Sequence, residues 1–129
     1  MTTRDSTAAE KANIALVDAF CQSWNEPTRC VTMVAQDASL KLFHDRPPVI
    51  GPAALESEMK NAMAGIKIDV EVHRVFAQGP VVVNVRTDVM TFPDRPDRIV
   101  KVIGFFHLKD GKIQEWADYI EAETTREQR

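Results

Sequence analysis

The clearest alternation of side chains lies at positions 81–90, which read Val-Val-Val-Asn-Val-Arg-Thr-Asp-Val-Met. Segments rich in β-branched residues favour strands, and successive side chains of a strand point to opposite faces. One face carries only apolar residues and a threonine, namely Val81, Val83, Val85, Thr87 and Val89. The other face places an amide, a guanidinium and a carboxylate in a row, in the order Val82, Asn84, Arg86, Asp88 and Met90. Buried charges are costly unless they are paired, so this row predicts the centre of a site.

Helical spacing dominates the part of the chain before this strand. Apolar residues recur on one helical face from Ile14 to Trp24, which predicts an amphipathic helix over residues 7–24 that ends before Pro27. A shorter helix is expected over residues 30–34, followed by a turn at 37–39. Gly51 and Pro52 open a third helix that ends near residue 65, because proline is favoured in the first helical turn.

Strand patterns fill the remaining segments. Strands are expected at residues 40–44, 66–73, 99–108 and 113–121, and Asp110-Gly111 between the last two is typical of a hairpin turn. Helices followed by an antiparallel meander indicate an α+β domain, in which a strongly curved mixed or antiparallel sheet wraps around helices as a cone with an internal pocket. We expect residues 1–129 to form a single domain, with flexible tails at residues 1–6 and 122–129.

Composition excludes several classes of function. A net charge of −3 and a pI near 5.6 argue against a nucleic-acid-binding surface, and no basic cluster stands out. Cys21 and Cys30 form no disulfide framework and, like the three scattered histidines, lack metal-ligand spacing. No apolar run reaches transmembrane length and the N-terminus has no signal-peptide core, so we expect a cytoplasmic protein without membrane or metal.

A second carboxylate is expected to join the charged row. Asp118 shares a strand face with Trp116 and Ile120, and one strand separates this strand from that of Arg86 and Asp88. Gly104 on the intervening strand would leave room for the charges. Two carboxylates around an arginine in an apolar pocket can act as base and acid, because their surroundings push their pKa values apart. The alternative is a purely structural ion-pair network.

These strands carry a recognisable combination of residues. Asn84-Val-Arg86-Thr-Asp88 on one strand accompanies Trp116-Ala-Asp118-Tyr119 on another, and the Pro47-Pro48-Val-Ile-Gly51 loop leads into the third helix. The combination resembles the limonene-1,2-epoxide hydrolase family, which belongs to the SnoaL-like and ketosteroid-isomerase-like cone folds (nuclear transport factor 2-like, cystatin-like). The resemblance extends to the first helix and so spans nearly the whole chain.

The resemblance implies a cofactor-free epoxide hydrolase that forms no covalent intermediate and assembles as a homodimer. Asp88 would activate water, Asp118 would protonate the epoxide oxygen, and Arg86 would bridge the two. The substrate would be a small lipophilic epoxide, such as a terpenoid, steroid or polyketide epoxide. The expected apolar lining comprises Leu42, Met63, Ile68, Met90, Val100, Val102, Phe106, Trp116 and Ile120.

The chain departs from the family pattern where the attacking water is held. The family uses a tyrosine and an asparagine two residues apart before the Pro-Pro loop, whereas Leu42 and His44 take those places here, and Ala117 replaces an arginine. We expect Asn84, His44 or both to complete the water site. Two other functions stay open: a related cone-fold isomerase or cyclase, and a non-catalytic module that binds small molecules as a dimer.

Overall fold

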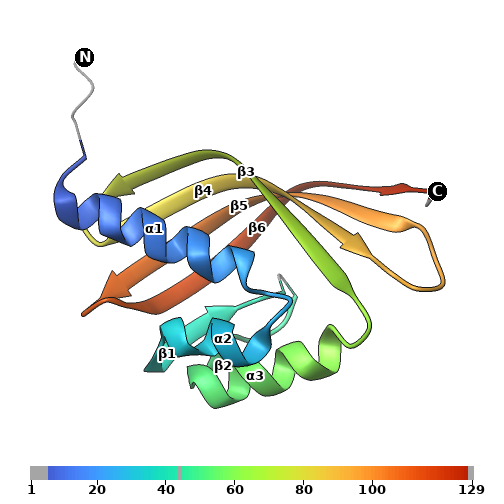
Figure 1. Ribbon diagram of the computed structural model, residues 1–129, viewed down its shortest axis with the longest axis horizontal. Helices are drawn as coiled ribbons and strands as arrows, with labels where there is room; N and C mark the ends of the chain where they lie inside the picture. The colour runs from blue at the N-terminus through green and yellow to red at the C-terminus, as the bar shows by residue number, and fades with distance from the viewer. Residues whose placement is uncertain (1–5, 44, 128–129) are drawn as a thin grey trace.

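The computed structural model describes residues 6–43 and 45–127. Within these ranges a six-stranded sheet, in the order β2-β1-β6-β5-β4-β3, curls around three α-helices (Figure 1). β1 runs parallel to β6 and the other neighbours are antiparallel, so the sheet is mixed. The predicted α+β cone fold is therefore confirmed.

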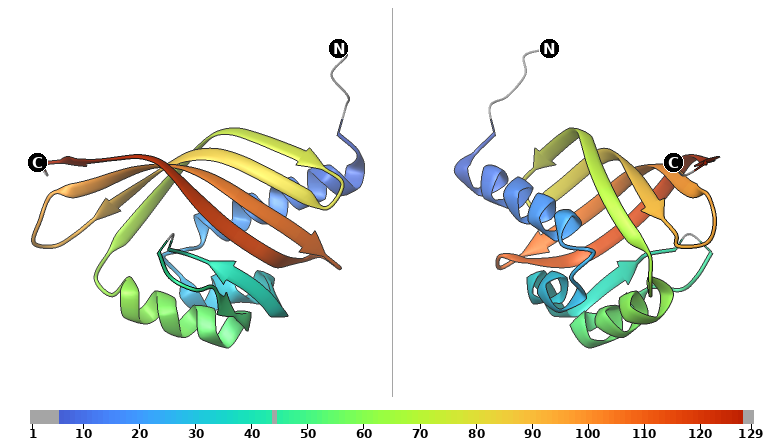
Figure 2. Two further views of the ribbon diagram at one scale, coloured as in Figure 1. Left: turned by 180° about the vertical axis from the view of Figure 1, so that it is seen from behind. Right: turned by 45° about the vertical axis from the view of Figure 1, so that its right-hand side comes forward.

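The helices lie on the concave side of the sheet. The helix α1 (Ala8–Gln22) begins at a capping box, in which Thr7 Oγ1 accepts from the Glu10 N–H at 3.1 Å and Glu10 Oε1 accepts from the Thr7 N–H at 2.8 Å. The chain then forms α2 (Pro27–Cys30), the single-turn 3-10 helix η1 (Val31–Met33) and α3 (Gly51–Ala62). Figure 2 shows α1 across one end of the sheet, with α2 and α3 beneath it.

Two strands come before α3 in the chain and four come after it. They are β1 (Val34–Lys41), β2 (Val49–Ile50), β3 (Lys67–Gln78), β4 (Val81–Thr91), β5 (Asp97–Lys109) and β6 (Lys112–Arg126). The turn predicted at 37–39 is wrong, because these residues lie inside β1. There the pairing with β6 is irregular between Val34 and Ser39, and the Asp37 carboxylate accepts from Gln114 Nε2 at 3.0 Å. A polar Asp-Ala-Ser run thus marks a bulge instead of a chain reversal.

The last strand is longer than the sequence pattern predicts. Residues 122–126 continue β6 and pair with residues 97–101 of β5, so this part of the predicted C-terminal tail is a paired strand. The side chains in this stretch are exposed and, apart from Ala122, polar, which hides the strand from a search for apolar alternation. β1 ends at Lys41 opposite Ala117, so β6 continues beyond it as an uncovered edge (Figure 1).

An aromatic cluster fills the core between α1 and the sheet. Phe20 meets Trp116 edge-on with ring centroids 5.2 Å apart, and Trp24 stacks on Trp116 at 5.1 Å. Phe106 stacks on the same indole at 6.3 Å. Such pairs stabilise a core beyond the area that they bury. The cluster also borders the polar row of β4, because Trp24 lies over the guanidinium of Arg86.

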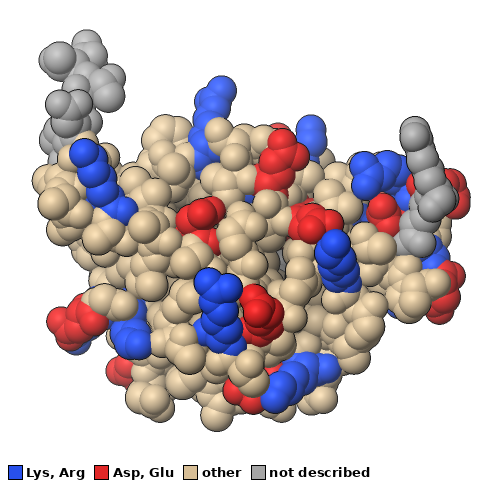
Figure 3. All heavy atoms as spheres, in the orientation of Figure 1, with Lys and Arg blue, Asp and Glu red and all other residues tan. Residues whose placement is uncertain are grey.

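The outer surface shows no segregation of charge in the view presented. Acidic and basic side chains are interspersed over the face shown in Figure 3. Among the described residues, no helix is long and apolar enough to cross a membrane.

Candidate active site

The guanidinium of Arg86 lies at the centre of a buried network. Its Nε donates to Asp88 Oδ1 at 2.9 Å and its Nη2 donates to Asp88 Oδ2 at 3.2 Å, which makes the pair bidentate. Nη2 also donates to Asp118 Oδ2 at 2.5 Å. The Arg86 side chain is fully buried, and those of Asp88 and Asp118 are 7% and 13% exposed. The structure therefore brings together the three residues predicted to carry the chemistry.

Asn84 supports Arg86 from the same strand face. Its Oδ1 accepts from Arg86 Nη1 at 3.0 Å, and its Nδ2 donates to Cys21 Sγ at 3.6 Å. Burial raises the pKa of the Cys21 thiol to about 12, so the thiol stays protonated. Both polar ends of Asn84 are thus occupied deep in the core, and Asn84 does not line the catalytic cavity described below.

Two tryptophans complete the surroundings of the charges. Trp116 Nε1 donates to Asp118 Oδ1 at 2.7 Å, so both oxygens of Asp118 accept N–H donors. The Arg86 Cζ atom lies 4.8 Å from the centroid of the Trp24 ring, a cation–π arrangement. Trp24 Nε1 is buried and has no acceptor among the residues that the structure describes.

Backbone register explains how separate strands meet here. Gly104 of β5 pairs with Asn84 of β4 on one side and with Asp118 of β6 on the other. A Cβ atom at Gly104 would overlap Arg86 Nη1 and Asn84 Oδ1. The absence of a side chain at this position therefore gives the guanidinium its path from β4 to β6, as the sequence predicted.

Burial perturbs the protonation of both acids. Desolvation raises the pKa of Asp88 above its ordinary value, against the opposing effect of Arg86. Desolvation raises the pKa of Asp118 in the same way, against Arg86 and Trp116, and the charge of Asp88 raises it further. Burial would lower the pKa of Arg86, but the two carboxylates outweigh burial and raise it. The arginine stays charged, while the carboxylates are poised for proton exchange.

Both carboxylates reach a small apolar cavity of about 60 Å³. Five of the predicted lining residues lie on this cavity: Leu42, Met63, Ile68, Met90 and Trp116. Trp24, Phe43 and Met59 also line it and were not predicted to do so. The positions of Trp24 and Met59 on the apolar stripes of the first and third predicted helices are the signal that could have found them.

Four of the predicted lining residues lie elsewhere. Val100, Val102 and Phe106 are buried but do not line the cavity. Ile120 is 46% exposed and lies on β6 beyond Ala117, the last residue of β6 that pairs with β1. His44, predicted to help hold the water, lies outside the described residues.

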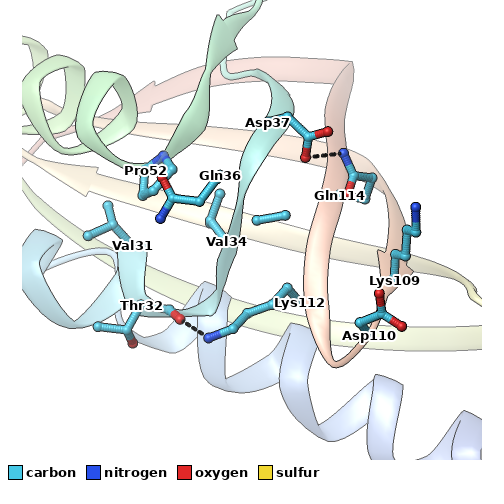
Figure 4. Close-up of a pocket in the computed structure, with 11 residues that line it drawn as sticks. Val31, Thr32, Val34, Gln36, Asp37, Pro52, Lys109, Asp110, Lys112 and Gln114 are labelled. Carbon is cyan, nitrogen blue, oxygen red and sulfur yellow. Dashed lines mark hydrogen bonds between the residues drawn. The ribbon is translucent and has the colours of Figure 1, made fainter.

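A second hollow, of about 560 Å³, adjoins the N-terminal half of β1 and the β5–β6 turn (Figure 4). Two of its polar side chains are hydrogen-bonded within the hollow: the Asp37 carboxylate accepts from Gln114, and Lys112 Nζ donates to the backbone carbonyl of Thr32 at 2.6 Å (Figure 4). Among the described residues, no group of three histidine, cysteine, aspartate or glutamate side chains could hold a metal ion. The buried carboxylate pair is therefore the candidate active site.

Comparisons with known proteins find solved structures of similar fold. The solved structure of an epoxide hydrolase from M. tuberculosis, described as similar to limonene-1,2-epoxide hydrolase, is 24% identical, with a TM-score of 0.76 over 87% of this chain and 84% of that one. A putative polyketide cyclase from Xanthomonas campestris is 18% identical, with a TM-score of 0.78 over 87% and 92%. A ketosteroid isomerase from Mycobacterium sp. is 17% identical, with a TM-score of 0.75 over 88% and 98%.

At these identities the structural similarities show a shared fold. The family is shown by the sequence itself, because the family model for the limonene-1,2-epoxide hydrolase catalytic domain matches residues 11–128. The chain belongs to the limonene-1,2-epoxide hydrolase family.

Proposed function

We propose that the protein is a cofactor-independent epoxide hydrolase that opens a lipophilic epoxide to a vicinal diol by direct attack of water. One observation carries the proposal: Asp88 and Asp118 both contact Arg86 and both line one apolar cavity. Epoxide opening needs a base to deprotonate water and an acid to protonate the leaving oxygen. A pair of carboxylates held by one guanidinium provides both.

Charge balance supports a shared proton. Two ionised carboxylates and one guanidinium have a net charge of −1, which is unfavourable in a buried site. Uptake of one proton makes the network neutral. It leaves one carboxylate ionised and the other protonated, so that the protonated group can act as an acid. The raised pKa values of both groups are in line with this uptake. The two carboxylates titrate as a pair coupled through Arg86, so neither apparent pKa belongs to one residue alone.

The roles of the two carboxylates follow the family resemblance. Asp88 would take a proton from water, and Asp118 would donate its proton to the epoxide oxygen. Burial raises the pKa of both groups, which is in line with one shared proton. Because the hydrogen-bonding environments of the two groups are similar, the order needs its own test. Azide attacks an epoxide without first losing a proton, so its attack needs no base. A variant that has lost the base should therefore still open an epoxide when azide is added, whereas a variant that has lost the acid should not.

Water binding differs from the family pattern. Asn84 is occupied by Arg86 and Cys21, so we assign it the positioning of Arg86 and not contact with the water. Leu42 offers no hydrogen bond from the cavity wall. His44 remains the predicted partner of the water. A cavity of about 60 Å³ has room for about two water molecules, whose share of liquid volume is about 30 Å³ each.

Diol formation from a panel of lipophilic epoxides tests the proposal. Wild-type protein should release diol, and Asp88→Asn and Asp118→Asn should each reduce turnover by at least about a hundred-fold, since acid–base catalysis contributes about 10²–10⁴-fold. Asp37→Asn is a matched control, because Asp37 is an exposed aspartate of β1 that does not line the cavity of Asp88 and Asp118. Equal activity in all four proteins would contradict the assigned roles.

A cyclase or isomerase is the second candidate, and the apolar Leu42 favours it. The polar side-chain groups that line the cavity come from the two aspartates and the two tryptophans, so an internal hydroxyl of the substrate could replace the water. An epoxide that carries such a hydroxyl distinguishes the two reactions. A cyclic ether as the main product would support the cyclase, and a triol would support the hydrolase. No turnover of any epoxide would support the binding module.

A homodimer is proposed from the outer face of the sheet. Phe76, Ile103 and Tyr119 are 57%, 39% and 55% exposed there, beside the half-buried Val83 and Val85. Contiguous apolar area of this kind commonly marks an interface. Sedimentation of wild-type protein should give a dimer, and Ile103→Glu should give a folded monomer. A monomeric wild type at high concentration would contradict the proposal.

A further inference from the structure

Two spaces meet at the mouth of the catalytic cavity. Phe43, Met63 and Met90 line both the inner cavity of about 60 Å³ and an outer groove of about 720 Å³. The inner space is well below the roughly 150 Å³ of an engineered cavity that admits benzene. A lipophilic epoxide therefore reaches the carboxylates only when side chains between the two spaces move aside, and most of the molecule then lies in the outer groove.

Phe43, Met63 and Met90 form the partition between the two spaces, and part of this partition can move. Met63 and Met90 are half-buried, and methionine side chains are flexible enough to repack around a ligand. Phe43 is covered from outside by Arg46, whose Cζ lies 4.5 Å from the ring centroid. Arg46 in turn pairs with Glu58 of α3 at 3.2 Å. The aromatic side of the partition is thus fixed and the two methionines form its movable side.

The lining of the outer groove has an apolar part and a charged part. The apolar part includes Ile66, Phe92 and Pro96. The charged part consists of Arg95, Arg98 and Glu123, which give the groove two positive charges against one negative. Arg98 is paired with Glu123 across β5 and β6.

Arg95 has donors available for a ligand. Its Cζ lies 4.3 Å from the Phe92 ring centroid, which holds the guanidinium beside the groove. Its Nε is 3.7 Å from Asp94 Oδ1, beyond hydrogen-bonding distance, and the Asp94 side chain is 80% exposed. No described residue accepts a hydrogen bond from this guanidinium. A planar fork of this kind matches a carboxylate.

We propose that the substrate is an elongated epoxide that ends in a carboxylate, with the epoxide between Asp88 and Asp118 and the carboxylate at Arg95 and Arg98. The apolar chain would pass between Met63 and Met90. This inference rests on the proposed function, because it takes the inner cavity as the place of the epoxide. It assigns the outer groove to recognition of the far end of the substrate, which no comparison assigns.

Binding is measured without turnover. A long-chain epoxy fatty acid and its methyl ester are titrated into Asp88→Asn protein, and fluorescence of Trp24 and Trp116, which line the cavity, reports binding. The acid should bind about ten-fold more tightly than the ester, as expected for one charge-assisted pair. Adding Arg95→Gln should abolish the preference, and Arg98→Gln should reduce it. Adding Arg74→Gln is the matched control, because Arg74 is an exposed arginine of β3 paired with Val85, and should leave it unchanged.

The outcomes separate this inference from the proposed function. Equal affinities for acid and ester, or a preference that survives Arg95→Gln, would overturn the carboxylate site even if the wild type hydrolyses compact epoxides. A preference that depends on Arg95, together with no diol from the wild type, would support the carboxylate site and contradict hydrolysis. Loss of the preference in Arg74→Gln as well would show general charge attraction and overturn the site.

Discussion

The Cα of Gly104 faces the guanidinium of Arg86 so closely that a Cβ atom there would overlap Nη1. Gly104 pairs with Asn84 and Asp118, so it lies between the strand that carries Arg86 and the strand that carries the second acid. The contact between Arg86 and Asp118 therefore depends on a residue with no side chain. It also explains how β4 and β6, separated by β5, share one charged network.

Gly104→Ala should displace the Arg86 side chain. The guanidinium cannot yield without breaking its bonds to Asp88, Asp118 or Asn84. We expect a loss of about 1–3 kcal/mol in the free energy of unfolding, typical of overpacking. We also expect about a hundred-fold loss in kcat/KM, as for misplaced catalytic groups. Urea unfolding and steady-state kinetics measure the two effects.

Lys101→Ala is the matched control for this substitution. Lys101 is exposed on the same strand and its side chain points away from the network. It should leave both quantities within about 0.5 kcal/mol of wild type. An active and fully stable Gly104→Ala protein would contradict the importance of the close approach.

Trp116→Phe should shift the pH dependence of catalysis. It removes the Nε1–H that donates to Asp118 and keeps an aromatic ring in the cluster. Hydrogen bonds to the ionised form of an acid lower its pKa, so their loss raises the pKa of Asp118. The alkaline limb of the kcat/KM profile, where the acid loses its proton, should move to higher pH. Trp24→Phe is the control, because Trp24 Nε1 contacts no acceptor among the described residues, and it should leave the limb in place.

Asn84→Leu should lower kcat more than it raises KM. Asn84 accepts from Arg86 but does not line the cavity, so it positions the arginine without touching the substrate. Loss of a hydrogen bond to a charged group costs about 1.5–3 kcal/mol, which corresponds to about ten-fold or more in rate. Asn84→Gln keeps a neutral amide acceptor and should recover part of the activity. A rise in KM alone would indicate that Asn84 contacts the substrate or the attacking water.

The stability of the wild type, measured relative to that of Asp118→Asn, should fall as the pH rises. Burial raises the pKa of Asp118 in the folded protein above the ordinary 3.8. The folded state then binds more protons than the unfolded state, so its stability is complete below the unfolded pKa and decreases as pH rises through the folded one. The free energy of unfolding of wild type minus that of Asp118→Asn should decrease as the pH rises above the ordinary pKa of 3.8 and through the raised pKa of the folded state. A difference that increases would show that Arg86 outweighs burial.

Much of the fold can be predicted because its apolar periodicity is strong. The stripe from Ile14 to Trp24 and the alternation along 81–90 identify α1 and β4. Two strand segments were missed because pairing with a neighbouring strand defines them, while their own residues show no strand pattern. Residues 34–39 pair irregularly with β6, and residues 122–126 are polar on both sides. Neither presents the two-residue alternation that indicates a strand.

The charged residues of the site were predicted, but only some of the residues that line its cavity were. Arg86, Asp88 and Asp118 could be placed together because strand alternation and the order of the hairpins fix their faces. Ile120 was misplaced because the end of β1 determines what covers β6, and the sequence places that end three residues too late. The role of Trp24 depends on a helix crossing the sheet, which no local pattern reports.

Single-turnover hydrolysis in water labelled with heavy oxygen tests the central claim most directly. Enzyme in excess over epoxide limits each molecule to one reaction. Direct attack by water on a substrate held at Asp88 and Asp118 predicts one labelled oxygen in the diol of the first turnover and none in the protein. An unlabelled first diol, with the label later found in an aspartate, would show a covalent ester and contradict the account.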